Sequence, residues 1–442
     1  MNNKILLILI MLCTAIGFSQ EKKSSFTLQE AIDYALENNL QAKNAALNID
    51  AAKAQKWETT AAGLPQMGAT IDYINNIKQQ FSEPVDFDNN GFIDFGAKQS
   101  VNAQATINQL VFDGSYLVAL QASKVFLEIS KSAKEKTDLE IRKAVINAYG
   151  NVLLTKESIL ILEKNIIILE KNLNDITKIY ENGLEEEESV EQLKITLSGV
   201  KSNLNNVNRL EKVSYKMLNI AIGKDINDPI AATDNLDTLA EQNITINLLE
   251  ISDDVENTID FKIADNDKRS KELLVKLEKS KALPTVGAFI NGSYLGNSQK
   301  FTFLTNNQQW LGTANFGARI SIPIFGVGLQ SARTQRAKIN LDIAENNLTE
   351  TAQQLKLQIA AAKSDYQFAI DDYDNKKENL NLAERIEKKN QIKFFEGIGS
   401  SFELRQAQMQ LYQAQNELLQ TMLDVITKKA ELETVLNTVP QN

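Results

Sequence analysis

The chain has 442 residues, and its 47 basic and 57 acidic side chains give a formal net charge of −10, which argues against a nucleic-acid partner. It contains no histidine and one cysteine, which excludes imidazole bases and most transition-metal sites and leaves no disulfide within the chain. No paired acid motif and no phosphate-cradling glycine loop is found along the sequence. We therefore expect a protein that is not an enzyme and that needs no metal or other cofactor.

The first residues have the pattern of an export signal. Lys4 precedes a nearly unbroken apolar run over residues 5–16, and Gly17 and Ser19 are the small residues that suit cleavage after Ser19. This run is shorter than the roughly 20 apolar residues of a membrane-spanning helix. Cys13 lies inside the run with no small residue just before it, which disfavours a lipoprotein. Export of a chain without disulfides suits a Gram-negative envelope.

An internal duplication organises the rest of the chain. Each half contains, in the same order, a Leu-Pro pair, a strand-like segment, a turn with Phe and Gly, a long helix, a glycine turn and a return helix. The matching segments are GLPQMGA (63–69) and ALPTVGA (282–288), VFDG (111–114) and IFG (324–326), and ENGL (181–184) and EGIG (396–399). The chain therefore consists of two copies of one structural repeat.

The long segments 115–181 and 329–395 are predicted to be coiled-coil helices, because apolar residues recur in them at alternating steps of four and three. This seam consists of Ile141, Val145, Ala148, Val152, Thr155, Ile159, Leu162, Ile166, Leu169, Leu173, Ile176 and Tyr180 in the first helix, and of Leu348, Ala352, Leu355, Ile359, Ala362, Tyr366, Ala369 and Tyr373 in the second. Leu160 and Ile167 lie outside the seam, and a helix with a second apolar face packs on both sides, as in a closed ring. The seam alone also fits a soluble coiled-coil dimer.

Two pairs of strands are predicted before the long helices. Residues 101–108 and 314–322 alternate between apolar and uncharged polar side chains, which is typical of transmembrane β-strands, although the pattern is weaker at 70–75. Loops at 81–96 and 296–309 join the strands of each pair. Four strands cannot close a barrel, and open edges are forbidden in lipid, so several copies must share one barrel. Tyr73, Tyr294 and Trp310 are candidates for the membrane interface, or for simple packing.

At this point the chain resembles the TolC family of outer-membrane efflux proteins. The segment FTLQEAIDYALENN (26–39), the two Leu-Pro pairs, Tyr149, Tyr366 and the two glycine turns carry the resemblance, which covers the whole mature chain. Thr27 and Glu30 also form a capping box. The resemblance implies a mainly α fold with membrane β-structure, in which a homotrimer forms a 12-stranded β-barrel continuous with a long α-helical barrel. It also implies an outer-membrane location, extension into the periplasm, and docking to a periplasmic adaptor and an inner-membrane pump of the resistance-nodulation-division or ABC type.

The resemblance also identifies candidate site residues. The adaptor-docking tips would be formed by Gly183, Leu184, Gly397, Ile398 and Ser400. The two glycines also suit a left-handed cap that only ends a helix.

Acidic residues near these tips have two readings. The run Glu185 to Glu188 departs from the small and apolar residues usual in the family, and is either a solvated turn or a cation-attracting mouth. Glu403, just after the second tip, is the candidate for a periplasmic constriction.

The expected boundaries follow from the duplication. They are a signal peptide at 1–19, a first repeat at 20–222 with a hairpin at about 66–112, an inter-repeat linker or equatorial region at 223–250, a second repeat at 251–437 with a hairpin at about 285–325, and a tail at 438–442.

The sequence thus predicts the exit duct of a tripartite efflux or type I secretion system. The alternative is a periplasmic coiled-coil adaptor or scaffold without a membrane barrel, which would need one long hairpin flanked by compact β-domains. A general porin is excluded by the long predicted helices, because it needs many strands per chain and little helix. The sequence leaves open whether the cargo is a drug, a metal ion, a siderophore or a polypeptide.

Overall fold

A computed structural model describes residues 24–78, 97–306, 308–324 and 326–438 of the chain. The expected signal peptide, the expected loop 81–96, Phe325 and the last four residues of the tail lie outside the described residues. The chain divides into two compact units, each made of segments from both repeats. One unit contains Met1–Asn44, Glu135–Thr258 and Leu355–Asn442, and the other contains Ala45–Lys134 and Ile259–Gln354.

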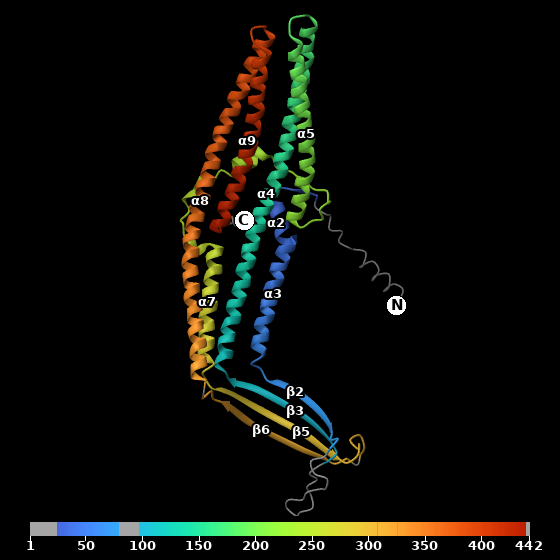
Figure 1. Cartoon of the computed structure of the whole chain (residues 1–442), viewed down its shortest axis with the longest axis vertical. Helices are drawn as coiled ribbons and strands as arrows, with labels where there is room; N and C mark the ends of the chain where they lie inside the picture. Colours follow the sequence, from blue (N-terminus) through green and yellow to red (C-terminus); the bar gives the residue numbers. More distant parts are fainter. Residues whose placement is uncertain (1–23, 79–96, 307, 325, 439–442) are drawn as a thin grey trace, which may run out of the picture. The chain divides into compact units, whose positions relative to one another are not determined.

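The element order follows the duplication (Figure 1). The first repeat contains β1 (Ser25–Phe26), α2 (Leu28–Asn38), α3 (Leu40–Ala61), β2 (Gln66–Asn75), β3 (Gln99–Phe112), α4 (Gly114–Glu181) and α5 (Glu187–Ile222). Between the repeats lie β4 (Ala231–Ala232), α6 (Leu236–Gln242), η1 (Ile246–Glu250) and η2 (Val255–Asn257). The second repeat contains α7 (Ile259–Ser280), β5 (Thr285–Ser298), β6 (Trp310–Ser321), α8 (Val327–Phe395) and α9 (Ser401–Leu436). The predicted long helices are thereby confirmed within two residues at each end.

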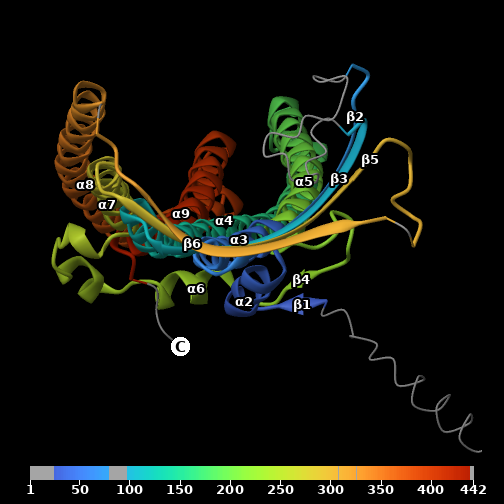
Figure 2. The ribbon, with the colours of Figure 1, turned by 90° about the horizontal axis from the view of Figure 1, so that it is seen from below.

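The four long strands form one antiparallel sheet in the order β2-β3-β5-β6. Figure 2 shows them side by side in a curved sheet. The two hairpins are joined through β3 and β5, which pair for most of their length, from Gln99 with Ser298 to Phe112 with Val286. A bulge lies between Leu110 and Phe112. Strands β2 and β6 each pair with one strand only among the described residues, so they form the two edges of the sheet.

The register separates the sheet into an apolar and a polar face, because directly paired residues of neighbouring strands point the same way. Rows on the apolar face include Met67, Ile107, Ile290 and Phe316, and Ala69, Ala105, Gly292 and Ala314. Rows on the polar face include Thr70, Gln104, Ser293 and Thr313, and Gly68, Thr106, Asn291 and Asn315. The apolar residues of the two predicted alternating segments therefore lie on the same face of the sheet. The weaker segment 70–75 follows the same alternation, since Ile71 and Tyr73 fall on the apolar face; Ile74 on the polar face and Asn75 on the apolar face are its two exceptions.

The loop end of the sheet carries a cluster of aromatic rings. Tyr73 lies edge-on to Phe301 and Phe303, at centroid distances of 5.9 and 6.1 Å, and Phe303 lies 6.3 Å from Trp310. Phe303 is buried by these contacts. Tyr73 and Trp310 thus pack against the loop between β5 and β6, whereas Tyr294 projects from the apolar face into solvent.

The predicted seams form the core of the helical hairpins. Val145, Val152 and Leu169 of α4 and Ile359 and Tyr366 of α8 are fully buried. The seam position Thr155 is satisfied within its own helix, because its hydroxyl donates to the carbonyls of Asn151 and Val152. The second apolar face is divided. Leu153, which also lies outside the seam, is buried inside the chain, whereas Leu160 and Ile167 are 58% and 67% exposed.

The duplicated tyrosines hold the inter-repeat segment against the long helices. The Tyr149 hydroxyl donates to the carbonyl of Phe26 at 2.8 Å and accepts from the backbone N–H of Thr233 and Asp234. The Tyr366 hydroxyl donates to the carbonyl of Asn243 at 2.6 Å and accepts from the N–H of Thr245. Burial raises the pKa of both phenols, so each stays protonated and keeps its donor.

The first described residues of the chain are held by the same inter-repeat segment. The predicted capping box is present, with the Glu30 carboxylate accepting from Thr27 N–H at 2.9 Å. The N–H of Leu28 donates to the Asp234 carboxylate at 2.7 Å, and β1 pairs in parallel with β4. At the end of α5, Gly223 has a φ of +82°, and a Cβ there would lie 2.6 Å from the carbonyl oxygen of Asn38, so glycine is required on two grounds.

We expect Tyr149→Phe to lower the stability of the folded chain. The change leaves the N–H of Asp234 without its partner and removes one of the hydrogen bonds that the Phe26 carbonyl accepts, at a cost of about 1–3 kcal/mol. Tyr366→Phe should have a similar effect, because the contacts are equivalent. Thermal unfolding of the purified protein measures both, with Tyr294→Phe as a matched control on an exposed tyrosine. If all three variants unfolded at the same temperature as the wild type, the two tyrosines would not hold the inter-repeat segment as described.

Candidate functional site

The first helical tip is a tight turn after α4. Gly183 has a φ of +76°, its N–H bonds the carbonyl of Tyr180, and the N–H of Leu184 reaches back to the carbonyl of Ile179 at 3.1 Å. This pair of bonds belongs to a glycine cap of the Schellman type. The side chain of Leu184 takes no part in the cap and is 79% exposed.

The second tip repeats this geometry after α8. Gly397 has a φ of +73°, its N–H bonds the carbonyl of Phe394, and the N–H of Ile398 bonds the carbonyl of Lys393 at 3.0 Å. Ile398 is 77% exposed, as Leu184 is in the first tip. Nothing lies within 4 Å of a Cβ placed on Gly183 or Gly397, so glycine is favoured by the backbone conformation and not by crowding.

Ser400 and Glu403 form the start of the return helix. The Ser400 hydroxyl accepts from the N–H of Glu403 at 3.2 Å, and the Glu403 carboxylate accepts from the N–H of Ser400 at 3.4 Å, which is a capping box. Both predicted residues thus have a local structural role. A constriction at Glu403 and adaptor contact at Ser400 stay predictions.

The acidic run of the first tip belongs to the start of α5. Glu185 accepts from the hydroxyl of Ser189 and Glu188 accepts from the amide of Gln192, each at 2.6 Å. Glu187 and Glu188 lie in the first turn, where negative charge is stabilised by the helix dipole. These contacts favour the reading as a solvated helix start.

The two tips belong to one packed structure. The hydroxyls of Ser189 and Ser401 lie 2.8 Å apart. Below them, a buried cluster draws residues from both hairpins. Its members are Leu169, Ile176, Val190, Leu193, Leu197, Phe394 and Leu404, with Ile166, Leu173, Ile179, Val200 and Tyr412 packed against it.

The structure adds Phe402 to the candidate residues. It lies in the first turn of α9, is 61% exposed, and has the guanidinium of Arg405 over its ring at 5.5 Å. Together with Leu184 and Ile398 it places exposed apolar side chains on both tips. In the sequence, Phe402 is an apolar residue outside the return-helix seam Leu404, Ala407, Leu411, Ala414 and Leu418, which is the local pattern that marks it.

A partly buried polar group, made of Glu387, Gln408 and Tyr412, lies between α8 and α9. Burial raises the pKa of Glu387, and a hydrogen bond with Gln408 opposes the rise. Burial also raises the pKa of Tyr412, and the neighbouring charge of Glu387 raises it further. In the described part of the chain, no group of three or more acidic, His or Cys side chains is arranged to hold a metal ion, and no helix is both long and apolar enough to cross a membrane.

Comparison with known proteins decides the family. The family model described as outer membrane efflux protein matches residues 31–224 and 255–438. The chain belongs to the outer membrane efflux protein family. It is therefore an outer-membrane efflux channel protein of Gram-negative bacteria that reaches into the periplasm, and it is not an enzyme. The resemblance inferred from the sequence is confirmed, and the alternative of a periplasmic scaffold is wrong.

Relatives of known name share most of the chain. The toluene efflux pump outer membrane protein TtgC of Pseudomonas putida is 23% identical over 410 residues, which cover 92% of this chain and 81% of TtgC. The antibiotic efflux pump outer membrane protein ArpC of Pseudomonas putida matches to the same extent.

Solved structures share the fold at lower identity. The crystal structure of CusC superimposes with a TM-score of 0.76 at 18% identity, and the match covers 92% of this chain and 91% of CusC. VceC from Vibrio cholerae superimposes with a TM-score of 0.74 at 16% identity over 92% and 95% of the two chains. The predicted fold class is confirmed by these likenesses.

We expect Glu387→Gln to stabilise the protein at neutral pH. The folded-state pKa of Glu387 is raised, so the charged carboxylate costs stability above that pKa, and the cost disappears below the unfolded pKa of about 4.3. Thermal unfolding should thus favour the variant at pH 7 and show little difference near pH 4. Glu384→Gln is the control, because Glu384 lies on the same helix and is exposed. A variant that is less stable than wild type at pH 7 would contradict the assignment.

Proposed function

We propose that three copies of this chain form one exit duct, with the four-stranded sheets joined into a barrel of twelve strands in the outer membrane. The open edges of the sheet carry this proposal. Strands β2 and β6 have no second partner within the described residues, and unpaired backbone groups are too costly to leave in lipid. The apolar face of the sheet would meet lipid, and the polar face would line the lumen.

The exposed apolar residues of the sheet support this orientation. Met67, Ile71, Ile290, Phe316 and Ile320 lie on the apolar face and are all more than half exposed in the single chain. A face of this composition is unfavourable in water and suits the hydrocarbon layer. The opposite face carries mainly Ser, Thr, Asn and Gln.

The helices also present surfaces for neighbouring copies. On α5, Leu210, Val213, Met217 and Ile220 are exposed and follow the alternating three-and-four spacing of a seam. Each of the four is 48–58% exposed in the single chain. We assign this stripe, with Leu160 and Ile167 of α4, to contacts between copies in the helical barrel.

The tips would dock a periplasmic adaptor that links the duct to an inner-membrane pump. Leu184, Ile398 and Phe402 give each chain an exposed apolar group on rigid glycine caps, which is the composition of a docking contact. The relatives TtgC and ArpC are named for toluene and antibiotic efflux, which favours small molecules as the cargo of this chain.

A substitution at a tip should lower efflux without lowering the amount of assembled trimer. Gly397→Trp places a side chain on a left-handed backbone at a local cost of about 1–2 kcal/mol, so the trimer should still form while efflux falls. Ile166→Asp introduces a charge against the buried cluster and should lower the amount of trimer itself. Membrane trimer and susceptibility to toluene and antibiotics are scored in parallel in a strain without other exit ducts. Normal efflux by an assembled Gly397→Trp variant would end the docking role of this tip.

The assignment of the two sheet faces can be tested with arginine. Ala105→Arg would place a charge on the lipid side at a cost of about 2–4 kcal/mol near the membrane midplane, and should lower the yield of trimer. Thr106→Arg is the matched control, because Thr106 is the next residue and pairs with Gly68 and Asn291 on the polar face. Ala318→Arg and Asn315→Arg repeat the comparison on β6. Similar yields from both sets would show that the faces are misassigned.

A further inference from the structure

The four strands of the sheet contain one acidic and one basic residue. Asp72 lies on β2 and Arg319 on β6, and the other residues of the four strands are uncharged. Both charged side chains are exposed, and the register places both on the polar face. Neither forms an ion pair in the part of the chain that the structure describes, although the Arg319 guanidinium lies 5.8 Å from the ring of Phe289. The two charges therefore stand on opposite open edges of one sheet.

We propose that Arg319 of one copy pairs with Asp72 of the next copy, directly across the junction of β6 and β2 that closes the sheet between chains. The inference rests on the proposed assembly of several copies into one barrel, and it adds the register of the strands at their junction. The basis of the inference is that an equivalent junction, between the two hairpins of one chain, is present in the structure.

The junction of β3 and β5 is the internal copy, because it joins the last strand of one hairpin to the first strand of the next. Leu64 and Leu283 are the matching leucines of the two Leu-Pro pairs, so Asp72 corresponds to Asn291, which stands equally far along its strand. Phe112 and Phe325 are the matching phenylalanines of the two turn segments VFDG and IFG, so Arg319, six residues before Phe325, corresponds to Thr106, six residues before Phe112. Within the chain, Thr106 pairs with Asn291. The same junction between chains therefore pairs Arg319 with Asp72.

The two hairpins support these correspondences independently. Thr106 pairs with Gly68 in the first hairpin, and Arg319 pairs with Gly287 in the second. Gly68 and Gly287 stand equally far after their Leu-Pro pairs. Both hairpins thus have the same internal register, so the correspondence of first strands and that of second strands agree.

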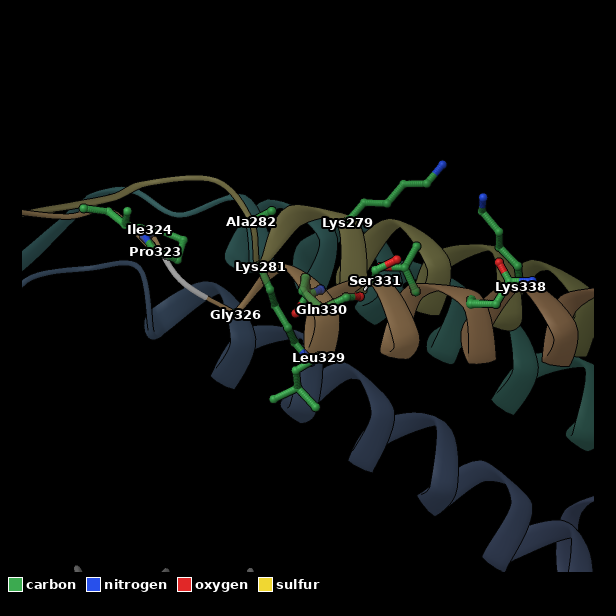
Figure 3. Close-up of a pocket in the computed structure, with 12 residues that line it drawn as sticks. Lys279, Lys281, Ala282, Pro323, Ile324, Gly326, Leu329, Gln330, Ser331 and Lys338 are labelled. Atoms are coloured by element: carbon green, nitrogen blue, oxygen red, sulfur yellow. Dashed lines mark hydrogen bonds between the residues drawn. The ribbon is translucent and has the colours of Figure 1, made fainter.

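A second contact follows from the same equivalence. Inside the chain, Leu283 covers the start of α4, where a Cβ on Gly114 would lie 2.8 Å from its Cδ1 atom. The equivalent place at the start of α8 holds a pocket of about 570 Å³. Its apolar wall is Pro323, Ile324 and Leu329, and Lys281 extends toward Leu329, whereas Lys279 and Lys338 point away (Figure 3).

The equivalent of Leu283 is Leu64, which is 47% exposed in the single chain. We assign the pocket to Leu64 of the neighbouring copy. This contact lies at the helix end of the same β6–β2 junction, so the pocket and the ion pair require one and the same placement of the next chain.

The ion pair would select the register. A slip of one residue exchanges the two faces and is excluded by their composition, but a slip of two residues keeps both faces intact. Such a slip would set Arg319 opposite Thr70 or Ile74 and leave both charges without a direct partner. Opposite charges on directly facing residues thus distinguish registers that the apolar pattern leaves equivalent.

Disulfide crosslinking tests the register. The only native cysteine is Cys13, in the expected signal peptide, so an introduced pair supplies all thiols of the mature chain. Asn108 pairs with Phe289 inside the chain, so Ser321→Cys with Thr70→Cys should crosslink neighbouring copies into covalent dimers and trimers upon oxidation. Ser321→Cys with Gly68→Cys is the matched control, displaced by two residues, and should crosslink less. If a trimer formed but the control pair crosslinked as well as the first pair or better, the proposed register would be wrong, and the proposed assembly would still hold. Absence of any oligomer of the wild-type chain would instead overturn the proposed assembly.

Charge exchange tests the ion pair itself. Asp72→Arg and Arg319→Asp should each lower the temperature at which the trimer dissociates in detergent, and the double variant should recover most of the loss. Asn315→Asp, on the polar face of β6 but away from the proposed partner, controls for added charge and should not be rescued by Asp72→Arg. A double variant that is as weak as both losses together would rule out the pairing, because uncoupled sites add their effects.

Discussion

The backbone of the sheet edges constrains this molecule more than any side chain does. A four-stranded antiparallel sheet leaves two rows of N–H and C=O groups without partners, and lipid offers none. A soluble protein can leave such edges in water or cover them with a charged residue or a loop. A membrane protein of this strand number has to complete its sheet with further copies of itself. The proposed assembly into one duct follows from this requirement.

Because the repeat is duplicated, the junction between two hairpins occurs once within each chain, and we propose that it occurs again between neighbouring chains. The β3–β5 junction inside the chain shows how one hairpin joins the next, and its pairs are visible in full. The same logic appears in the helices, where Tyr149 and Tyr366 clamp different parts of the inter-repeat segment with the same arrangement of one donated and at least one accepted hydrogen bond. The two repeats differ at their tips, where the first carries the acidic run Glu185 to Glu188 and the second carries Phe402.

At the tips, the groups that stabilise the turns differ from the side chains that we propose to dock a partner. Their turns are closed by backbone hydrogen bonds that any glycine cap makes, and the buried cluster below holds the hairpins together. Leu184, Ile398 and Phe402 contribute little to either and are exposed. Apolar side chains on a rigid turn lose little conformational freedom when a partner covers them, which favours binding.

The sequence by itself determined the period of every long element, because a helix seam and a strand alternation are local patterns that burial imposes on neighbouring residues. It also determined the duplication, the glycine turns and the family. Only the tertiary structure decided which strands pair, since the order β2-β3-β5-β6 joins segments that are far apart in the chain. It also decided that Leu153 is buried within the chain while Leu160 and Ile167 are exposed, and that Glu403 closes a capping box. A residue's partner across space depends on the register of the whole sheet or bundle, and no local pattern of residues contains that information.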